Sequence, residues 1–173
     1  MIVALDVHYF NEGALHADPA YAIAAAVGFQ DWRSSEPIET WTARVENIEP
    51  YEPGKFFKRE LPCLNAVIEK IDYPVGCWIV DGHVWLDNGQ PGLGHYLHRT
   101  FKHPWPVIGV AKRAFRDGGQ AIEVVRGKSK APLYVTSIKC NPDGAADFVR
   151  KMHGEFRIPT MLKLVDHLCR GLS

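Results

Sequence analysis

The stretch Val75-Gly76-Cys77-Trp78-Ile79-Val80-Asp81-Gly82 is a short apolar run that ends in an acid and a turn pair. An apolar run of this length, closed by a turn, predicts a buried β-strand. A second such run lies at the N-terminus, where residues 2–10 alternate and contain Leu5-Asp6. Sites in open α/β sheets lie at the carboxyl ends of strands. We therefore expect Asp6 and Asp81 to lie close together.

Two neighbouring carboxylates predict a bound cation. Like charges at short range are costly unless a cation neutralises them. Carboxylate oxygens without a Cys or His partner favour Mg²⁺ or Mn²⁺ over zinc. Taken singly, each aspartate is also explained as a turn former or a helix cap.

The rest of the chain alternates between strand and helix patterns. Residues 21–29 are apolar and Ala-rich, and periodicity alone does not distinguish a strand from a helix there. Asn141-Pro142-Asp143 is a typical helix start. We predict further strands over 38–45, 107–110, 121–126 and 133–138, and helices over 59–71, 92–101, 142–153 and 159–169. This order predicts an α/β protein, with a mixed sheet flanked by helices in a single domain over 1–173.

Composition excludes several classes of protein. Of the 173 residues, 46% are hydrophobic and 23% are charged, as in globular proteins. No apolar run reaches the roughly 18 residues of a membrane helix, so we expect no membrane partner. The N-terminal residues predict a strand rather than a signal peptide. Four widely spaced cysteines without a CxxC pair then indicate reduced thiols and a cytoplasmic protein.

The net charge is zero, but its distribution is uneven. Residues 1–50 hold eight acids and two bases, whereas residues 99–130 hold eight bases and two acids. This asymmetry is typical of a surface for a polyanion beside a site for cations. Two solvated faces of opposite sign also explain it, and charge alone favours this plainer explanation.

Six segments resemble motifs of the endonuclease V family, in the family's order and with near-family spacing. Residues 50–62 resemble its PYxPGxxxFRExP segment, and residues 80–83 resemble the start of its VDGHG motif. The other four are 5–10 for DVxY, 108–112 for IGVAK, 132–135 for PVYVS, and 157–159 with 164–166 for RLPEPTRxAD.

The resemblance implies a ribonuclease-H-like fold and an Mg²⁺- or Mn²⁺-dependent endonuclease acting on DNA or RNA that contains inosine. Members of the family cut the second phosphodiester on the 3′ side of the lesion. Carried over by position, the resemblance assigns metal-binding carboxylates, an active-site lysine, a strand-separating aromatic and pocket loops. These are Asp6, Glu60, Asp81 and the accessory Asp166 for the metal, Lys112 for the lysine, Tyr51 for the aromatic, and Gly54 and Gly82 for the loops.

The chemistry of these residues agrees with the implied reaction. A metal-held water attacks a phosphodiester, and Lys112 offers a compact charge for the phosphate. Stacking of a base on Tyr51 would contribute about 1–3 kcal/mol of binding free energy. The plain alternatives are a turn aromatic for Tyr51 and a surface charge for Lys112. Among the histidines, His83 is the best functional candidate because it adjoins Asp81.

One loop departs from the family pattern. After VDGHG the family has a His-Pro-Arg-Arg run, and this chain has Asp87-Asn88-Gly89-Gln90. Two arginines near phosphate are missing, which predicts weaker strand binding or a changed substrate. Asp87 is explained as a surface acid in a turn or as an added metal ligand.

Three hypotheses follow for the function. The leading one is an endonuclease V-like nuclease. The alternatives are a non-cleaving nucleic-acid-binding module with the same fold, and a nuclease on branched or other substrates. Intact Asp6, Glu60 and Asp81 argue for cleavage, because a retired site would not keep a costly acid cluster.

Overall fold

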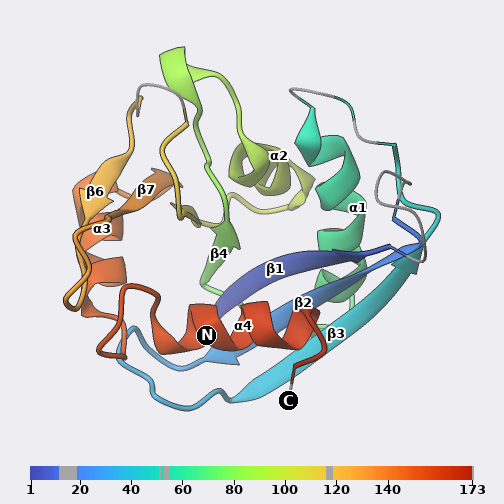
Figure 1. The fold of residues 1–173 in the computed structure, drawn as a ribbon, viewed down its shortest axis with the longest axis horizontal. Helices are drawn as coiled ribbons and strands as arrows, with labels where there is room; N and C mark the ends of the chain where they lie inside the picture. Colours follow the sequence, from blue (N-terminus) through green and yellow to red (C-terminus); the bar gives the residue numbers. More distant parts are fainter. Residues whose placement is uncertain (12–18, 51, 53–54, 116–118, 173) are drawn as a thin grey trace.

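The computed structural model describes residues 1–11, 19–50, 52, 55–115 and 119–172, and it is built around a seven-stranded sheet (Figure 1). The strands lie in the order β3-β2-β1-β4-β5-β7-β6. β1 pairs antiparallel with β2 and parallel with β4, so the sheet is mixed. The bounds are β1 Ile2–Phe10, β2 Tyr21–Phe29, β3 Glu39–Glu46, β4 Cys77–Asp81, β5 Val107–Ala111, β6 Ile122–Val124 and β7 Leu133–Ile138.

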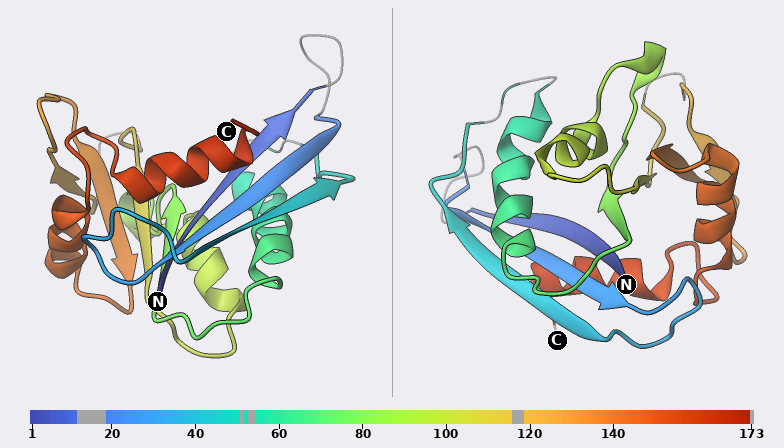
Figure 2. Two further views of the ribbon diagram at one scale, coloured as in Figure 1. Left: turned by 90° about the horizontal axis from the view of Figure 1, so that it is seen from below. Right: turned by 180° about the vertical axis from the view of Figure 1, so that it is seen from behind.

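Helices cover both faces of the sheet, as the sequence predicted (Figure 2). α1 (Phe56–Ile68) and α2 (Leu93–Thr100) bury one apolar core against the sheet. α3 (Pro142–Lys151) and α4 (Thr160–Cys169) bury a second core on the other face. Among the described residues, no helix is both long enough and apolar enough to cross a bilayer.

Strand alternation determines the face on which each site residue lies. Side chains two apart along a strand share a face. On β1, Val3 and Leu5 belong to the α1/α2 core, whereas Ile2 and Ala4 belong to the α3/α4 core. Asp6 follows Ala4 by two residues and therefore lies on the α4 face. Asp81 follows Ile79 on β4 in the same way.

Pairing resolves the ambiguous segment and shifts some boundaries. Tyr21–Phe29 is a strand, because β1 pairs with one edge along its whole length and β3 pairs with its other edge. α1 begins three residues before the predicted start, where the ring of Phe57 stacks on that of Tyr96 in α2 at 3.6 Å between centroids. The predicted start of α3 is confirmed, since the Asn141 side chain accepts a hydrogen bond from the amide of Gly144 at 3.0 Å.

Candidate metal centre and adjoining pocket

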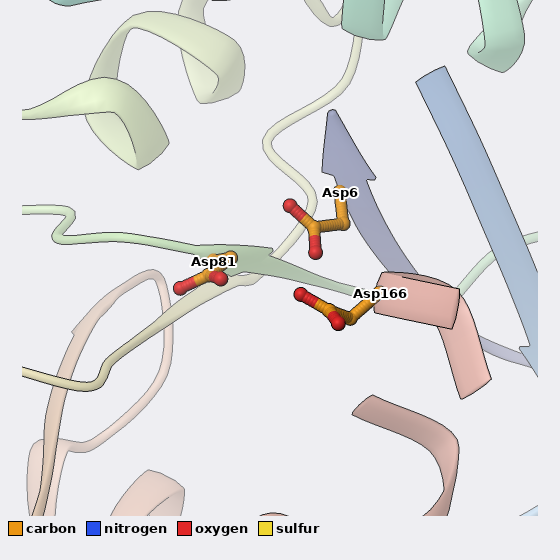
Figure 3. A group of neighbouring side chains, drawn as sticks. All are labelled: Asp6, Asp81 and Asp166. Carbon is orange, nitrogen blue, oxygen red and sulfur yellow. The ribbon is translucent and has the colours of Figure 1, made fainter. Parts of the chain in front are cut away.

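Three aspartates converge on the α4 face of the sheet (Figure 3). Asp6 lies on β1, Asp81 ends the neighbouring β4, and Asp166 projects from α4. One carboxylate oxygen from each lies within 4.8 Å of the other two. We call these three residues the carboxylate cluster. The β1–β4 register, which pairs Leu5 with Val80, sets Asp6 and Asp81 side by side.

The electrostatics of the cluster favour a bound cation. Burial, and then the charge of Asp81, raise the pKa of Asp6 to about 7. The protein alone therefore stabilises a negative charge poorly at this position. A divalent cation would relieve this conflict, and carboxylate oxygens are the ligands that Mg²⁺ and Mn²⁺ prefer. The donor set thus fits a divalent metal.

Lys112 contacts two members of the carboxylate cluster. It follows β5, and its Nζ lies 2.7 Å from Asp81 Oδ2 and 3.5 Å from Asp166 Oδ1. Burial lowers the pKa of Lys112, but the hydrogen bond and charge of Asp81 outweigh burial and raise that pKa overall. The side chain is therefore a fixed ammonium at the edge of the site.

Asp166 has a second basic partner. Arg170, one helical turn later, donates from Nε at 2.9 Å and from Nη2 at 3.1 Å to the two carboxylate oxygens of Asp166. Burial raises the pKa of Asp166, but the Arg170 hydrogen bonds and the charge of Lys112 outweigh it and lower that pKa. Sequence reasoning missed Arg170, although its i,i+4 spacing from Asp166 was a usable signal.

Glu60 lies beside the cluster rather than in it. It comes from α1, on the opposite face of the sheet, and it is 7% exposed. Burial, and then the charges of Asp6 and Asp81, raise the pKa of Glu60 well above its usual range. Among the described residues, the group of oxygens within 4.8 Å of one another does not include Glu60.

A pocket of about 380 Å³ adjoins the cluster at Asp81. Its lining includes Glu60, Asp81 and Gly82, and we call it the Gly82 pocket. His83 also lines it, and His83 Nε2 lies 3.1 Å from the carbonyl oxygen of Arg113. The other lining residues are mainly aromatic and apolar, namely Phe56, Phe57, Leu86, Gln90, Pro91, Gly92, Leu93 and Phe115.

Two of the predicted residues are not described by the structure, and a third lies outside the carboxylate cluster. Tyr51 and Gly54 lie outside the described residues. Asp87 lies in a short turn, Asp87–Gly89, and does not belong to the group of carboxylates that could hold a metal.

The basic stretch 99–130 is not one solvated surface. Arg126 is buried and donates to backbone carbonyls of residues 150–157. Arg157 donates to the carbonyls of Pro132, at 2.7 Å, and of Lys112. These two arginines hold the segment of residues 150–157 beside Lys112. Local sequence context does not distinguish Arg126 from a surface charge, whereas Arg157 belongs to a segment that resembles a family motif.

Comparisons with known proteins identify relatives of the chain. The family model described as endonuclease V matches residues 1–132. The endonuclease V of Rhodospirillum centenum is 32% identical over 181 residues, which cover 91% of this chain and 72% of that protein. The endonuclease V of Xanthomonas axonopodis pv. citri is 27% identical over 169 residues, covering 87% and 71%.

Solved structures share the fold. The Bacillus subtilis endonuclease V structure matches with a TM-score of 0.80 at 17% identity, covering 98% of this chain and 79% of that one. The Ciona intestinalis endonuclease V, solved with a 24mer DNA containing an inosine followed by a ribo-adenosine, matches with a TM-score of 0.77 at 17% identity, covering 98% and 84%. These matches confirm the predicted ribonuclease-H-like α/β fold.

Proposed function

The chain belongs to the endonuclease V family, whose members are nucleases and thus phosphodiester hydrolases, and on that premise we propose that it is a divalent-metal-dependent endonuclease that cuts DNA or RNA 3′ to inosine. One observation carries the proposal. Three carboxylates with oxygens within 4.8 Å of one another adjoin a pocket of about 380 Å³. A metal-dependent cut needs a metal site, and a lesion base needs a pocket. For a cut close to the lesion, the two must lie side by side.

Asp6, Asp81 and Asp166 would hold the metal, with Glu60 as a further carboxylate at its edge. When bound, Mg²⁺ or Mn²⁺ lowers the pKa of a coordinated water and stabilises the leaving oxygen of a phosphodiester. Because the pKa of Asp6 is raised to about 7, metal binding near neutral pH would release a proton from its carboxyl group.

Lys112 would bind the scissile phosphate. Its ammonium is held by Asp81 and Asp166, so it is oriented before substrate arrives. A preorganised cation stabilises charge that develops in the transition state without reorganising. A phosphate at the cluster would replace part of this ion pairing with its own oxygens.

The Gly82 pocket would receive the flipped base. Extrusion of a base from a duplex costs a few kcal/mol, and least at a mismatch. Phe56 and Phe57 offer aromatic surface, and His83 and Gln90 are polar groups at the wall. The proposal also includes Tyr51 as the strand-separating aromatic and Gly54 as part of a loop that forms the pocket.

The proposed substrate is a nucleic acid with deaminated adenine. The Ciona intestinalis relative was solved with DNA that contains inosine, which supports this choice. A role in DNA repair follows if the DNA form is the natural substrate. Among the described residues the cysteines are free thiols, which supports a reducing compartment such as the cytoplasm.

The test is cleavage of labelled single-inosine oligonucleotides, as DNA and RNA, single- and double-stranded, with Mg²⁺ or Mn²⁺. Asp81→Ala serves as the inactive variant, and Asp72→Asn, an exposed acid outside the site, serves as its matched control. We expect a cut 3′ to inosine that only Asp81→Ala abolishes. Cleavage by Asp81→Ala at the wild-type rate would show that the metal centre is assigned wrongly.

Two further arms separate the alternatives. Competition with plain and branched oligonucleotides tests inosine specificity. If the natural substrate is not inosine-containing, these competitors should inhibit cleavage as strongly as an inosine-containing competitor does. Binding without any cleavage would instead favour a non-cleaving module.

A further inference from the structure

The loop between α3 and α4, orange to red in Figure 1, carries a large aromatic residue, Phe156. Phe156 is 72% exposed, more than the other large hydrophobic side chains among the described residues. Single exposed hydrophobic residues are ordinary on protein surfaces. Phe156 therefore needs independent observations before it indicates a site.

The first observation is that its loop is held rigidly. Arg126 donates to the carbonyls of Phe156 and Gly154, at 3.1 Å each, and to that of Met152. His153 Nδ1 lies 2.9 Å from Thr160 Oγ1, which ties the loop to the start of α4. These hydrogen bonds hold the backbone that carries Phe156.

The second observation is that basic side chains lie beside the ring. A depression of about 340 Å³ is lined by Phe156 together with Lys163 and His167, which lie one turn apart on α4. A neighbouring depression shares these residues and adds one acid, Glu155. We call Phe156, Lys163 and His167 the Phe156 shelf.

The third observation is continuity with the carboxylate cluster. Lys112 and Asp166 line the same depression as Phe156. Asp81, in contrast, lines the Gly82 pocket. The pocket, the cluster and the shelf therefore follow one another, with the cluster in the middle.

We propose that the Phe156 shelf binds the substrate strand on the 3′ side of the cut. Phe156 stacks on one base of that flank, and Lys163 and His167 hold an adjoining phosphate. This inference rests on the proposed function, because inosine in the pocket and a cut 3′ to it place the outgoing flank at the shelf. An aromatic platform beside cations is the usual design for single-stranded nucleic acid.

The test uses single-inosine oligonucleotides with a constant 5′ flank and a 3′ flank shortened by one nucleotide at a time. In the wild-type protein, kcat/KM rises about 5- to 150-fold when the nucleotide that reaches the shelf is added. Phe156→Ala loses this step, and Phe156→Tyr keeps it. Tyr73→Ala, which removes another exposed aromatic, also keeps it.

Two further readouts separate stacking from charge. An abasic nucleotide at the stacking position retains the phosphate, so it lowers wild-type kcat/KM and leaves Phe156→Ala at its own value. Lys163→Ala lowers the slope of log affinity against log salt by about 0.7, as expected for one single-strand phosphate.

The outcomes are distinct for the two proposals. Inosine-dependent cutting with the same length profile in wild type and Phe156→Ala overturns the shelf and leaves the proposed function intact. If the wild type does not cut next to inosine, the proposed function fails. In that case the affinity for unmodified single strands tests the proposal. The shelf binds a strand only if Phe156→Ala has a lower affinity for these strands than Tyr73→Ala.

Discussion

The carboxylate cluster and the Gly82 pocket share Asp81, yet they are built from different kinds of structure. The cluster takes Asp6 and Asp81 from paired strands and Asp166 from α4. Much of the pocket wall comes from residues 82–93, which contain only a short turn before α2 begins. The residues that resemble the family are intact in the cluster, whereas the His-Pro-Arg-Arg run is replaced beside the pocket.

This difference shows which part of the protein can change freely. A residue on a paired strand is positioned by hydrogen bonds on both sides and by packing on both faces. A loop residue is positioned by fewer neighbours and accepts substitution more readily. We therefore expect the chemistry to be robust and the choice of substrate to depend on the loop.

The largest effect should come from the cluster. Asp6→Asn removes one charge from the proposed metal site and keeps the shape of the side chain. We expect a loss of kcat of about a thousandfold or more, because metal catalysis contributes several kcal/mol. Single-turnover cleavage with saturating enzyme measures it, and Glu36→Gln, an exposed acid far along the chain, is the control. A loss below tenfold would contradict the assignment of Asp6.

The next effect tests the scaffold on the cluster side. Arg126→Met keeps the stem of the side chain but leaves the carbonyls of the 150–157 segment without their donor. We expect the free energy of unfolding to fall by about 4 kcal/mol, since several charged hydrogen bonds to buried and partly buried carbonyls are lost together. Urea unfolding measures it. Lys128→Met, an exposed neighbour, should change little, and equal effects of both would refute the role of Arg126.

Asp6 also predicts a pH dependence of stability in metal-free protein. The pKa of Asp6 rises from 3.8 to about 7 on folding, so the folded state binds the proton more tightly than the unfolded state. Its contribution to stability is present at low pH and is lost as pH rises through 7. Asp6→Asn should therefore be more stable than wild type at pH 8, by about 4 kcal/mol, and close to it near pH 4. Urea unfolding in EDTA at both values measures this, and parallel curves would refute it.

Most of the regular elements were predictable from the sequence, with residues 21–29 left open between strand and helix, and the contacts that complete the site were not. Alternation and apolar runs predict β1 and β4, and hence the proximity of Asp6 and Asp81. Asp166 was assigned only through the family resemblance, because nothing local in the sequence shows that α4 crosses β1. The buried role of Arg126 depends on carbonyls about 25 residues away, and local charge counting assigns it to a surface.

A smaller effect is expected on the pocket side. Tyr51→Ala should weaken binding of inosine-containing DNA by about 5- to 100-fold, through the loss of one stacked base, and should change binding of undamaged DNA much less. Fluorescence anisotropy with both duplexes measures the ratio, and Tyr51→Phe should retain it. Equal losses on both duplexes would mean that Tyr51 is a structural aromatic and that the pocket distinguishes the lesion without it.

The smallest effect is a gain, and it tests the altered loop directly. Gln90 stands where the family has its second arginine, lies exposed at the pocket wall and has an extended backbone that accepts any side chain. Gln90→Arg should tighten DNA binding about threefold at low salt and add about 0.9 to the salt slope, as one new phosphate contact on duplex DNA. Gly89→Arg is the contrasting variant, because Gly89 has φ +71° and a side chain there is strained. If Gln90→Arg leaves both affinity and salt slope unchanged, no phosphate passes this loop, and the substrate follows a different path from the family's on the pocket side while the cluster keeps its chemistry.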